Sequence, residues 1–113
     1  MANVNLQVEH RTEPWGVLLT VRGSAGVTNL SELDRHILPI VASKPALVVL
    51  DASGLEFISS LGIGSFTTLH RGLKPSGQLR IAGANANVRA VFERTKLTTL
   101  LALFDSVEDA LRG

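Results

Sequence analysis

The stretch that decides the fold is Leu47-Val-Val-Leu-Asp-Ala-Ser-Gly-Leu-Glu-Phe-Ile-Ser-Ser-Leu-Gly-Ile-Gly-Ser-Phe66. It opens with a run of apolar residues that is too short for a stable helix. A short apolar run bounded by turn residues is typical of a strand buried on both faces, as in the middle of a parallel sheet. The run therefore predicts a central strand over 47–50, with Asp51 and Ser53 at its carboxyl end.

The second half of the stretch predicts a helix. Ser59 and Ser60 precede a segment whose apolar residues recur at helical spacing, and serine is a common helix cap. We expect the helix to continue to about Lys74. Gly62 and Gly64 fall in its first turn, where each costs about 1 kcal/mol relative to alanine. That cost predicts a close approach to the backbone, by the sheet beneath or by a partner above. In open α/β sheets, functional residues usually lie at the edge where the strands end and the helices begin, which is where this stretch is expected to lie.

Strands and helices alternate on both sides of the stretch. Two alternating runs, 3–10 and 17–22, predict an antiparallel hairpin, and the residues 23–26 that follow are expected to form a loop. The next helix is expected to kink or end near Leu38, because Pro39 cannot donate a backbone hydrogen bond. Later patterns predict a strand over 78–82, a helix after Asn85, a short strand before 105 and a final helix capped by Asp105. The resulting fold is α/β: a single domain over 1–113, with one mixed, largely parallel sheet of about four or five strands covered by about four helices.

Composition narrows the classes of function. The 113 residues include no cysteine, which excludes disulfides and thiolate chemistry. The net charge is near +1, which gives no reason to expect nucleic-acid binding. His10, His36 and His70 are scattered and show no metal-ligand spacing. No apolar run approaches the ~20 residues that span a bilayer, and no signal peptide is visible. We therefore expect a cytoplasmic protein without metal, cofactor or membrane insertion.

Enzyme motifs are also missing from the sequence. A catalytic serine would need a base and a Gly-x-Ser-x-Gly turn, and the chain has no such turn. Gly62-x-Gly64 lacks the rest of a dinucleotide fingerprint, and no Gly-Lys-Ser/Thr phosphate loop is present. We expect that the chain is not an enzyme.

The segment Asp51-Ala-Ser53-Gly-Leu-Glu-Phe57-Ile-Ser-Ser60-Leu-Gly62-Ile-Gly64 resembles the STAS domain family, the anti-sigma factor antagonists and their relatives. In that family a strand ends in Asp-x-Ser, followed by a Phe and by Asp-Ser-(Ser/Thr)-Gly-Leu-Gly at the start of a helix. The resemblance places Ser60 on the serine that a partner kinase phosphorylates. Two residues depart from the pattern: Ser59 stands where the family has Asp, and Leu61 where it has Ser or Thr. The loop at 23–26 also lacks an acidic residue found in the family.

The resemblance implies an anti-sigma factor antagonist that regulates sigma-factor-dependent transcription. It would bind an anti-sigma factor serine kinase, be released by phosphorylation of Ser60 (or, in a shifted register, Ser59), and be reset by a protein phosphatase. ATP would belong to the kinase. The residues expected to contact the partner are Gly23, Ser24, Asp51, Ser53, Ser59, Leu61, Gly62, Gly64 and Ser65.

Two alternatives remain open at this point. Either serine could serve only as a helix cap, which is a common role for serine. The whole chain could also be a STAS-like scaffold subunit of a larger assembly, such as a lipid-transport complex or a multi-subunit signalling particle, without a phosphorylation switch.

If the serine is phosphorylated, physical chemistry favours an effect on binding over an effect on folding. A helix N-terminus tolerates an anion, whereas a phosphate adds about −1.5 to −2 charges to any contact surface.

Overall fold

The computed structural model describes residues 6–25, 30–96 and 101–113. Its elements follow the predicted order, with these bounds: β1 (Leu6–Glu13), β2 (Gly16–Ala25), α1 (Leu30–Ser43), β3 (Leu47–Ile58), α2 (Ser60–Leu73), β4 (Gln78–Ala82), α3 (Ala86–Arg94), β5 (Ala102–Phe104) and α4 (Val107–Arg112). The hairpin, the central strand and the helix after Ser59 are all confirmed.

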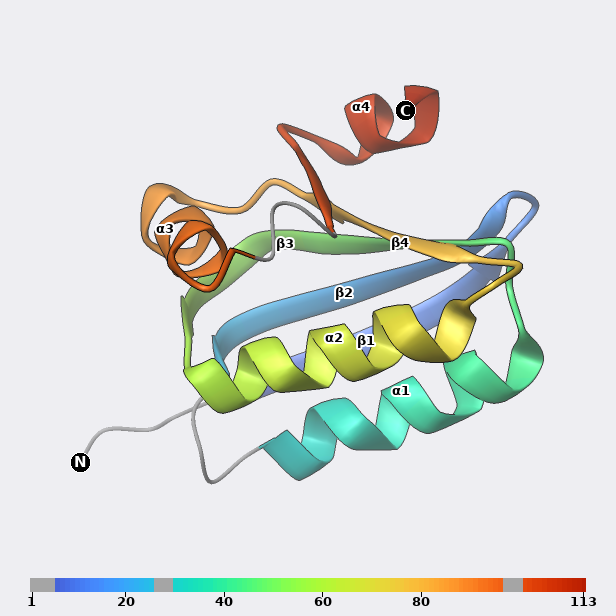
Figure 1. The fold of residues 1–113 in the computed structure, drawn as a ribbon, viewed down its shortest axis with the longest axis horizontal. Helices are drawn as coiled ribbons and strands as arrows, with labels where there is room; N and C mark the ends of the chain where they lie inside the picture. The colour runs from blue at the N-terminus through green and yellow to red at the C-terminus, as the bar shows by residue number, and fades with distance from the viewer. Residues whose placement is uncertain (1–5, 26–29, 97–100) are drawn as a thin grey trace.

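The five strands form one mixed sheet, in the order β1-β2-β3-β4-β5. β1 pairs with β2 antiparallel, and the remaining pairs are parallel, as predicted. α1 and α2 cover one face of the sheet and α4 lies against the other (Figure 1). Val48 and Val49 of β3 are both fully buried. Val48 belongs to the core beneath α1 and α2, and Val49 to the core beneath α4. This two-sided burial is why the central strand is apolar on both faces.

The central strand is longer than predicted, because β3 continues through Asp51 to Ile58. Its pairing with β2 is parallel throughout, with register shifts between Thr20 and Arg22 and between Gly23 and Ser24 of β2. Such irregularities accommodate extra residues on one strand and bend it. The predicted strand end at 50 is therefore wrong. The predicted loop at 23–26 is also wrong over its first three residues, which belong to β2, and Gly26 lies outside the described residues.

The predicted break in α1 does not occur. Pro39 lies inside a continuous helix that runs to Ser43. Its neighbours Ile37 and Ile40 are both buried in the main core, whereas Pro39 is exposed. The apolar contacts on either side hold the helix together where one backbone hydrogen bond is lost.

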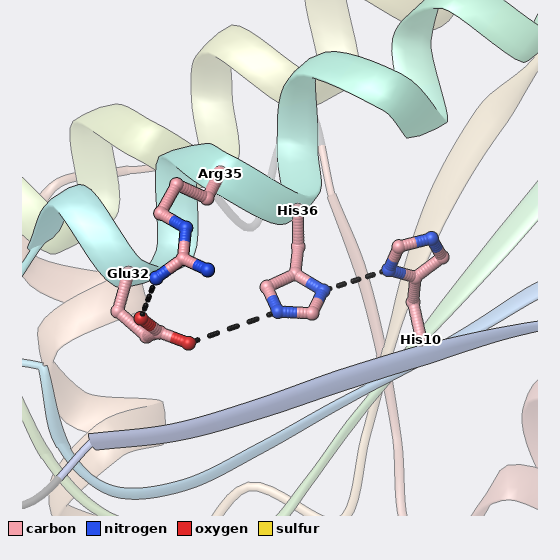
Figure 2. Close-up of polar contacts among 4 residues, drawn as sticks. All are labelled: His10, Glu32, Arg35 and His36. Atoms are coloured by element: carbon pink, nitrogen blue, oxygen red, sulfur yellow. Dashed lines mark hydrogen bonds and ion pairs between the residues drawn. The ribbon is translucent and has the colours of Figure 1, made fainter.

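A pair of histidines connects α1 to the edge strand. The Nδ1 atoms of His10 on β1 and His36 on α1 lie 2.7 Å apart, so one ring donates a hydrogen bond to the other (Figure 2). Glu32, one turn earlier on α1, lies 3.8 Å from the Nε2 of His36 and also pairs with Arg35. Burial, and then the neighbouring His10, lower the pKa of His36 below its usual value.

The C-terminal helix packs on the opposite face, over Val49 and Ala82. Its N-cap is Ser106, whose Oγ accepts the backbone N–H of Asp109 at 3.1 Å. The prediction that Asp105 caps this helix is therefore wrong by one residue.

Candidate functional site

The start of α2 is fixed by Ser59. Its backbone has extended dihedral angles, and its Oγ accepts the N–H of Gly62 at 3.1 Å, which makes it the N-cap of the helix. Its own N–H donates to the carbonyl oxygen of Ala25, the last residue of β2, at 2.9 Å. Ser59 is thus engaged on two sides and ties the helix to the end of the neighbouring strand.

Ser60 is the first residue of α2, and its side chain is exposed. The first turn of a helix leaves backbone N–H groups without intrahelical partners and carries about half a positive charge. Ser60, which the family resemblance places on the phosphorylated position, is exposed, whereas Ser59 is partly buried. The capping role that could have applied to either serine belongs to Ser59.

The two glycines of the first turns have different surroundings. A Cβ atom on Gly62 would lie 2.8 Å from Cγ1 of Ile58 and 3.3 Å from the carbonyl oxygen of Ala25. A Cβ atom on Gly64 would meet nothing within 4 Å. Gly62 thus allows the helix to approach the sheet, whereas Gly64 leaves its backbone open to an external contact. The explanation by the sheet beneath is confirmed for Gly62, and contact of a partner at Gly64 stays a prediction.

Exposed apolar side chains occur at the end of β3, at the start of α2 and on α1. Phe57, at the end of β3, is 53% exposed, and Leu61, next to Ser60, is 57% exposed. Leu38 on α1 is 72% exposed. Large apolar residues clustered on a surface are typical of a protein contact. Sequence reasoning missed Leu38, although its position beside Ile37 of the buried stripe was a signal, because adjacent helical residues point about 100° apart.

A groove separates α1 from α2 beside this serine. It encloses about 490 Å³ and is lined by Asp34, Ile37, Leu38, Leu61, Gly64, Ser65 and Thr68. Ser65 of α2 donates a hydrogen bond from its Oγ to Oδ1 of Asp34 on α1, at 3.2 Å. Three of the predicted contact residues, Leu61, Gly64 and Ser65, therefore share one hollow surface.

The end of β2 lies beside the same surface. Ser24 pairs with Phe57 and Ala25 with Ile58, immediately before the cap of α2. Gly23 has a φ of +91°, a backbone conformation that favours glycine. The predicted contact residue Ser24 thus pairs with the exposed Phe57, and Gly23 precedes it on β2.

Three predicted contact residues lie elsewhere: Gly62 is buried against the sheet, and Asp51 and Ser53 are on β3. Oδ1 of Asp51 accepts hydrogen bonds from the N–H and Oγ of Ser53, at 3.0 and 2.7 Å. Asp51 shares a face of β3 with Val49, on the α4 side of the sheet, because side chains alternate along a strand. There it lines a separate polar hollow of about 470 Å³, together with residues of β1 and β2.

Two other kinds of site are absent from residues 6–25, 30–96 and 101–113. Within them, no group of three or more His, Cys, Asp or Glu side chains is arranged to hold a metal ion. Nor does any helix in these ranges combine the length and apolar character needed to cross a bilayer.

Comparison with known proteins gives a family match over nearly the whole chain. The family described as "STAS domain" matches residues 3–110. The anti-sigma-F factor antagonist RsfB of Mycobacterium tuberculosis is 24% identical over 96 residues, which cover 85% of this chain and 79% of RsfB.

Solved structures share the fold at low sequence identity. An anti-sigma factor antagonist from Mycobacterium paratuberculosis superposes with a TM-score of 0.91 at 21% identity, covering 98% of this chain and 95% of that one. The Bacillus cell fate determinant SpoIIAA in its phosphorylated form gives a TM-score of 0.70 at 17% identity, covering 96% of this chain and 97% of that one.

Proposed function

Because the chain belongs to the STAS domain family, we propose that it is an anti-sigma factor antagonist switched by phosphorylation of Ser60. In its unphosphorylated form it binds an anti-sigma factor serine kinase and so frees a sigma factor for transcription. The kinase, which holds the ATP, phosphorylates Ser60 and dissociates, and a protein phosphatase restores the active form. The chain itself is a cytoplasmic regulator and catalyses no reaction.

The observation that carries this proposal is the division of roles between two adjacent serines. Ser59 caps α2, so the helix start stays formed whatever happens to its neighbour. Ser60 is exposed in the first helical turn, where a kinase can reach it and where the helix tolerates an anion. A phosphate there leaves the fold intact and changes the surface.

The same surface explains why phosphorylation would release the partner. Phe57 and Leu61, which precede and follow Ser60 in the chain, have exposed apolar side chains, and burying that apolar area favours association. A phosphate brings about −1.5 to −2 charges into this contact, and a charge buried without a partner is strongly unfavourable. The names of the relatives agree with this role, and SpoIIAA is known in a phosphorylated form.

A binding titration tests the proposal. Each anti-sigma factor serine kinase encoded in the source genome is purified and titrated by calorimetry into the chain, first unmodified and then with phosphoserine incorporated at position 60. We expect one kinase to bind the unmodified chain and to bind the phosphorylated chain at least ~10-fold more weakly, a difference of about 1.4 kcal/mol. Failure of every kinase to bind, or equal affinity for both forms, would contradict it.

A second candidate function is a STAS-like scaffold subunit without a switch. The observations that favour it are Leu61, an exposed leucine where the family has Ser or Thr, and Ser59, which stands where the family has Asp. Apolar surface of this kind also suits a permanent contact in a lipid-transport complex or a multi-subunit signalling particle. Isolation of the native complex distinguishes the two functions: a scaffold stays in a stoichiometric assembly and carries no phosphate on Ser60.

A further inference from the structure

Apolar and charged side chains are regularly spaced along the groove between α1 and α2. Both helices connect parallel strands in the same sense, so they run in the same direction side by side (Figure 1). The hydrogen bond between Ser65 and Asp34 places these two residues at the same level. Leu61 lies one turn before Ser65 on α2, and Leu38 lies one turn after Asp34 on α1. One turn of helix rises about 5.4 Å, so the two leucines lie about two turns apart along the groove.

The middle of the groove carries its charge. Among the described residues that line it, Asp34 alone is ionisable. The adjacent Arg35 pairs with Glu32 at 2.7 Å rather than with Asp34. Ser65 donates to one carboxylate oxygen of Asp34 and so helps to orient that group. The groove thus presents an apolar position, a negative charge and a second apolar position, each about one turn from the next.

The lining of the groove is open at Gly64, an exposed residue where a Cβ atom would meet nothing within 4 Å. Two parallel helices with a small residue between them leave room for the side chains of a third helix, packed ridge into groove. Residues three or four apart on such a helix would point the same way and match the one-turn spacing of the groove.

We infer that this groove receives an amphipathic helix of the anti-sigma partner that carries apolar, cationic and apolar side chains at three- or four-residue spacing. The Lys or Arg binds Asp34, and the two apolar side chains lie against Leu61 and Leu38. The inference rests on the proposed function, because Leu61 directly follows the switch serine and joins the groove to the surface around Ser60. The groove adds to that function a region that determines which anti-sigma factor binds.

Three variants test the groove against the kinase that binds the wild-type chain in the titration described above. Leu38→Ser changes an exposed side chain two turns from the switch, and we expect it to weaken binding at least ~10-fold. Asp34→Asn keeps an oxygen that can accept the Ser65 hydrogen bond, and we expect weaker binding with a smaller dependence on salt concentration. Leu111→Ser, a half-exposed leucine on α4 and on the other side of the sheet, is the matched control and should bind like the wild type.

The outcomes separate the groove from the switch. If the wild-type chain binds the kinase and Leu38→Ser binds equally well, the groove is not used, although the proposed function stands. If no kinase binds the wild-type chain, the proposed function and the groove inference both fail. Sedimentation of the chain alone gives the third result: dimers that Leu38→Ser dissociates would show that the occupant is a second copy, which would also overturn the inference. Unfolding curves of each variant confirm that lost binding does not reflect lost structure.

Discussion

The side chain of Ser59 accepts the backbone N–H of Gly62 at 3.1 Å, and this bond makes Ser59, not Ser60, the N-cap of α2. In the proposed switch, Ser59 therefore has the structural role and the adjacent Ser60 the regulatory one. The stability of the fold should depend on Ser59, and the affinity for the partner should depend on Ser60.

Ser59→Ala should lower the free energy of unfolding by about 1 kcal/mol, the usual cost of removing a capping side chain. The variant should remain a substrate of the kinase, because Ser60 is unchanged. Urea denaturation measures the first effect and phosphate incorporation the second. Ser60→Ala is the matched control: it should unfold like the wild type and still bind the kinase. Equal losses of stability in the two variants would contradict the division of roles.

The two glycines of α2 should respond oppositely to alanine. Gly64→Ala should raise the free energy of unfolding by up to about 1 kcal/mol, because alanine favours a helix and nothing obstructs the new methyl group. Gly62→Ala should lower it, because the methyl group would lie 2.8 Å from the buried Ile58 and overpack the core. Thermal or urea unfolding of the pair decides the matter, and a stable Gly62→Ala protein would be inconsistent with the packing described.

Gly64→Trp tests the partner surface without disturbing the core. The new side chain projects into open space above α2, so the melting temperature should stay close to that of the wild type. The bulk should abolish kinase binding, because Gly64 lines the groove and an indole there would obstruct a partner. An unfolded variant would show that Gly64 is a packing residue, and unimpaired binding would place the partner elsewhere.

Acid should destabilise the fold through His36. Its pKa is lowered in the folded protein by burial and then by His10, so unfolding takes up a proton below neutral pH. The stability it contributes is complete above its unfolded pKa of about 6.5 and is lost as the pH falls through the lower folded-state pKa. Denaturation from pH 8 to 5 should show a shallower pH dependence for His36→Gln, and an unchanged slope would rule this contribution out.

The sequence was sufficient to predict the sheet, because its signals are local. The run around Val48 and Val49 could only be a strand buried on both faces, and alternation in β1 and β2 identified the hairpin. The extension of β3 was missed because Asp51 to Gly54 has the composition of a turn, and the register shifts that keep it in the sheet depend on β2. Pro39 was misread because the burial of Ile37 and Ile40 depends on tertiary packing.

The candidate site divides in the same way. Ser60 and the glycines could be located from the motif, since they follow one another in the chain. The groove could not be predicted, because it brings Asp34 and Leu38 of one helix against Leu61 and Ser65 of another. The separation of Asp51 from the helix start also depends on the length and bulges of β3.

Ser60→Asp approximates the phosphorylated state. A carboxylate in the first turn of a helix is favourable, so the variant should fold with the stability of the wild type. Its affinity for the kinase should fall at least ~10-fold, or about 1.4 kcal/mol, because a charge enters the surface that carries the exposed side chains of Phe57 and Leu61. Calorimetric titration beside Ser60→Ala measures the difference, and equal affinities of the two variants would show that charge at this position has no effect on the partner.

The central claim is tested most directly by finding where the phosphate goes. The wild-type chain is incubated with ATP and the kinase that binds it, and the modified residue is identified by tandem mass spectrometry of the peptide that contains both serines. The account predicts phosphate on Ser60, continued phosphorylation of Ser59→Ala and none of Ser60→Ala. Phosphate on Ser59, or a chain that its bound kinase never modifies, would contradict it.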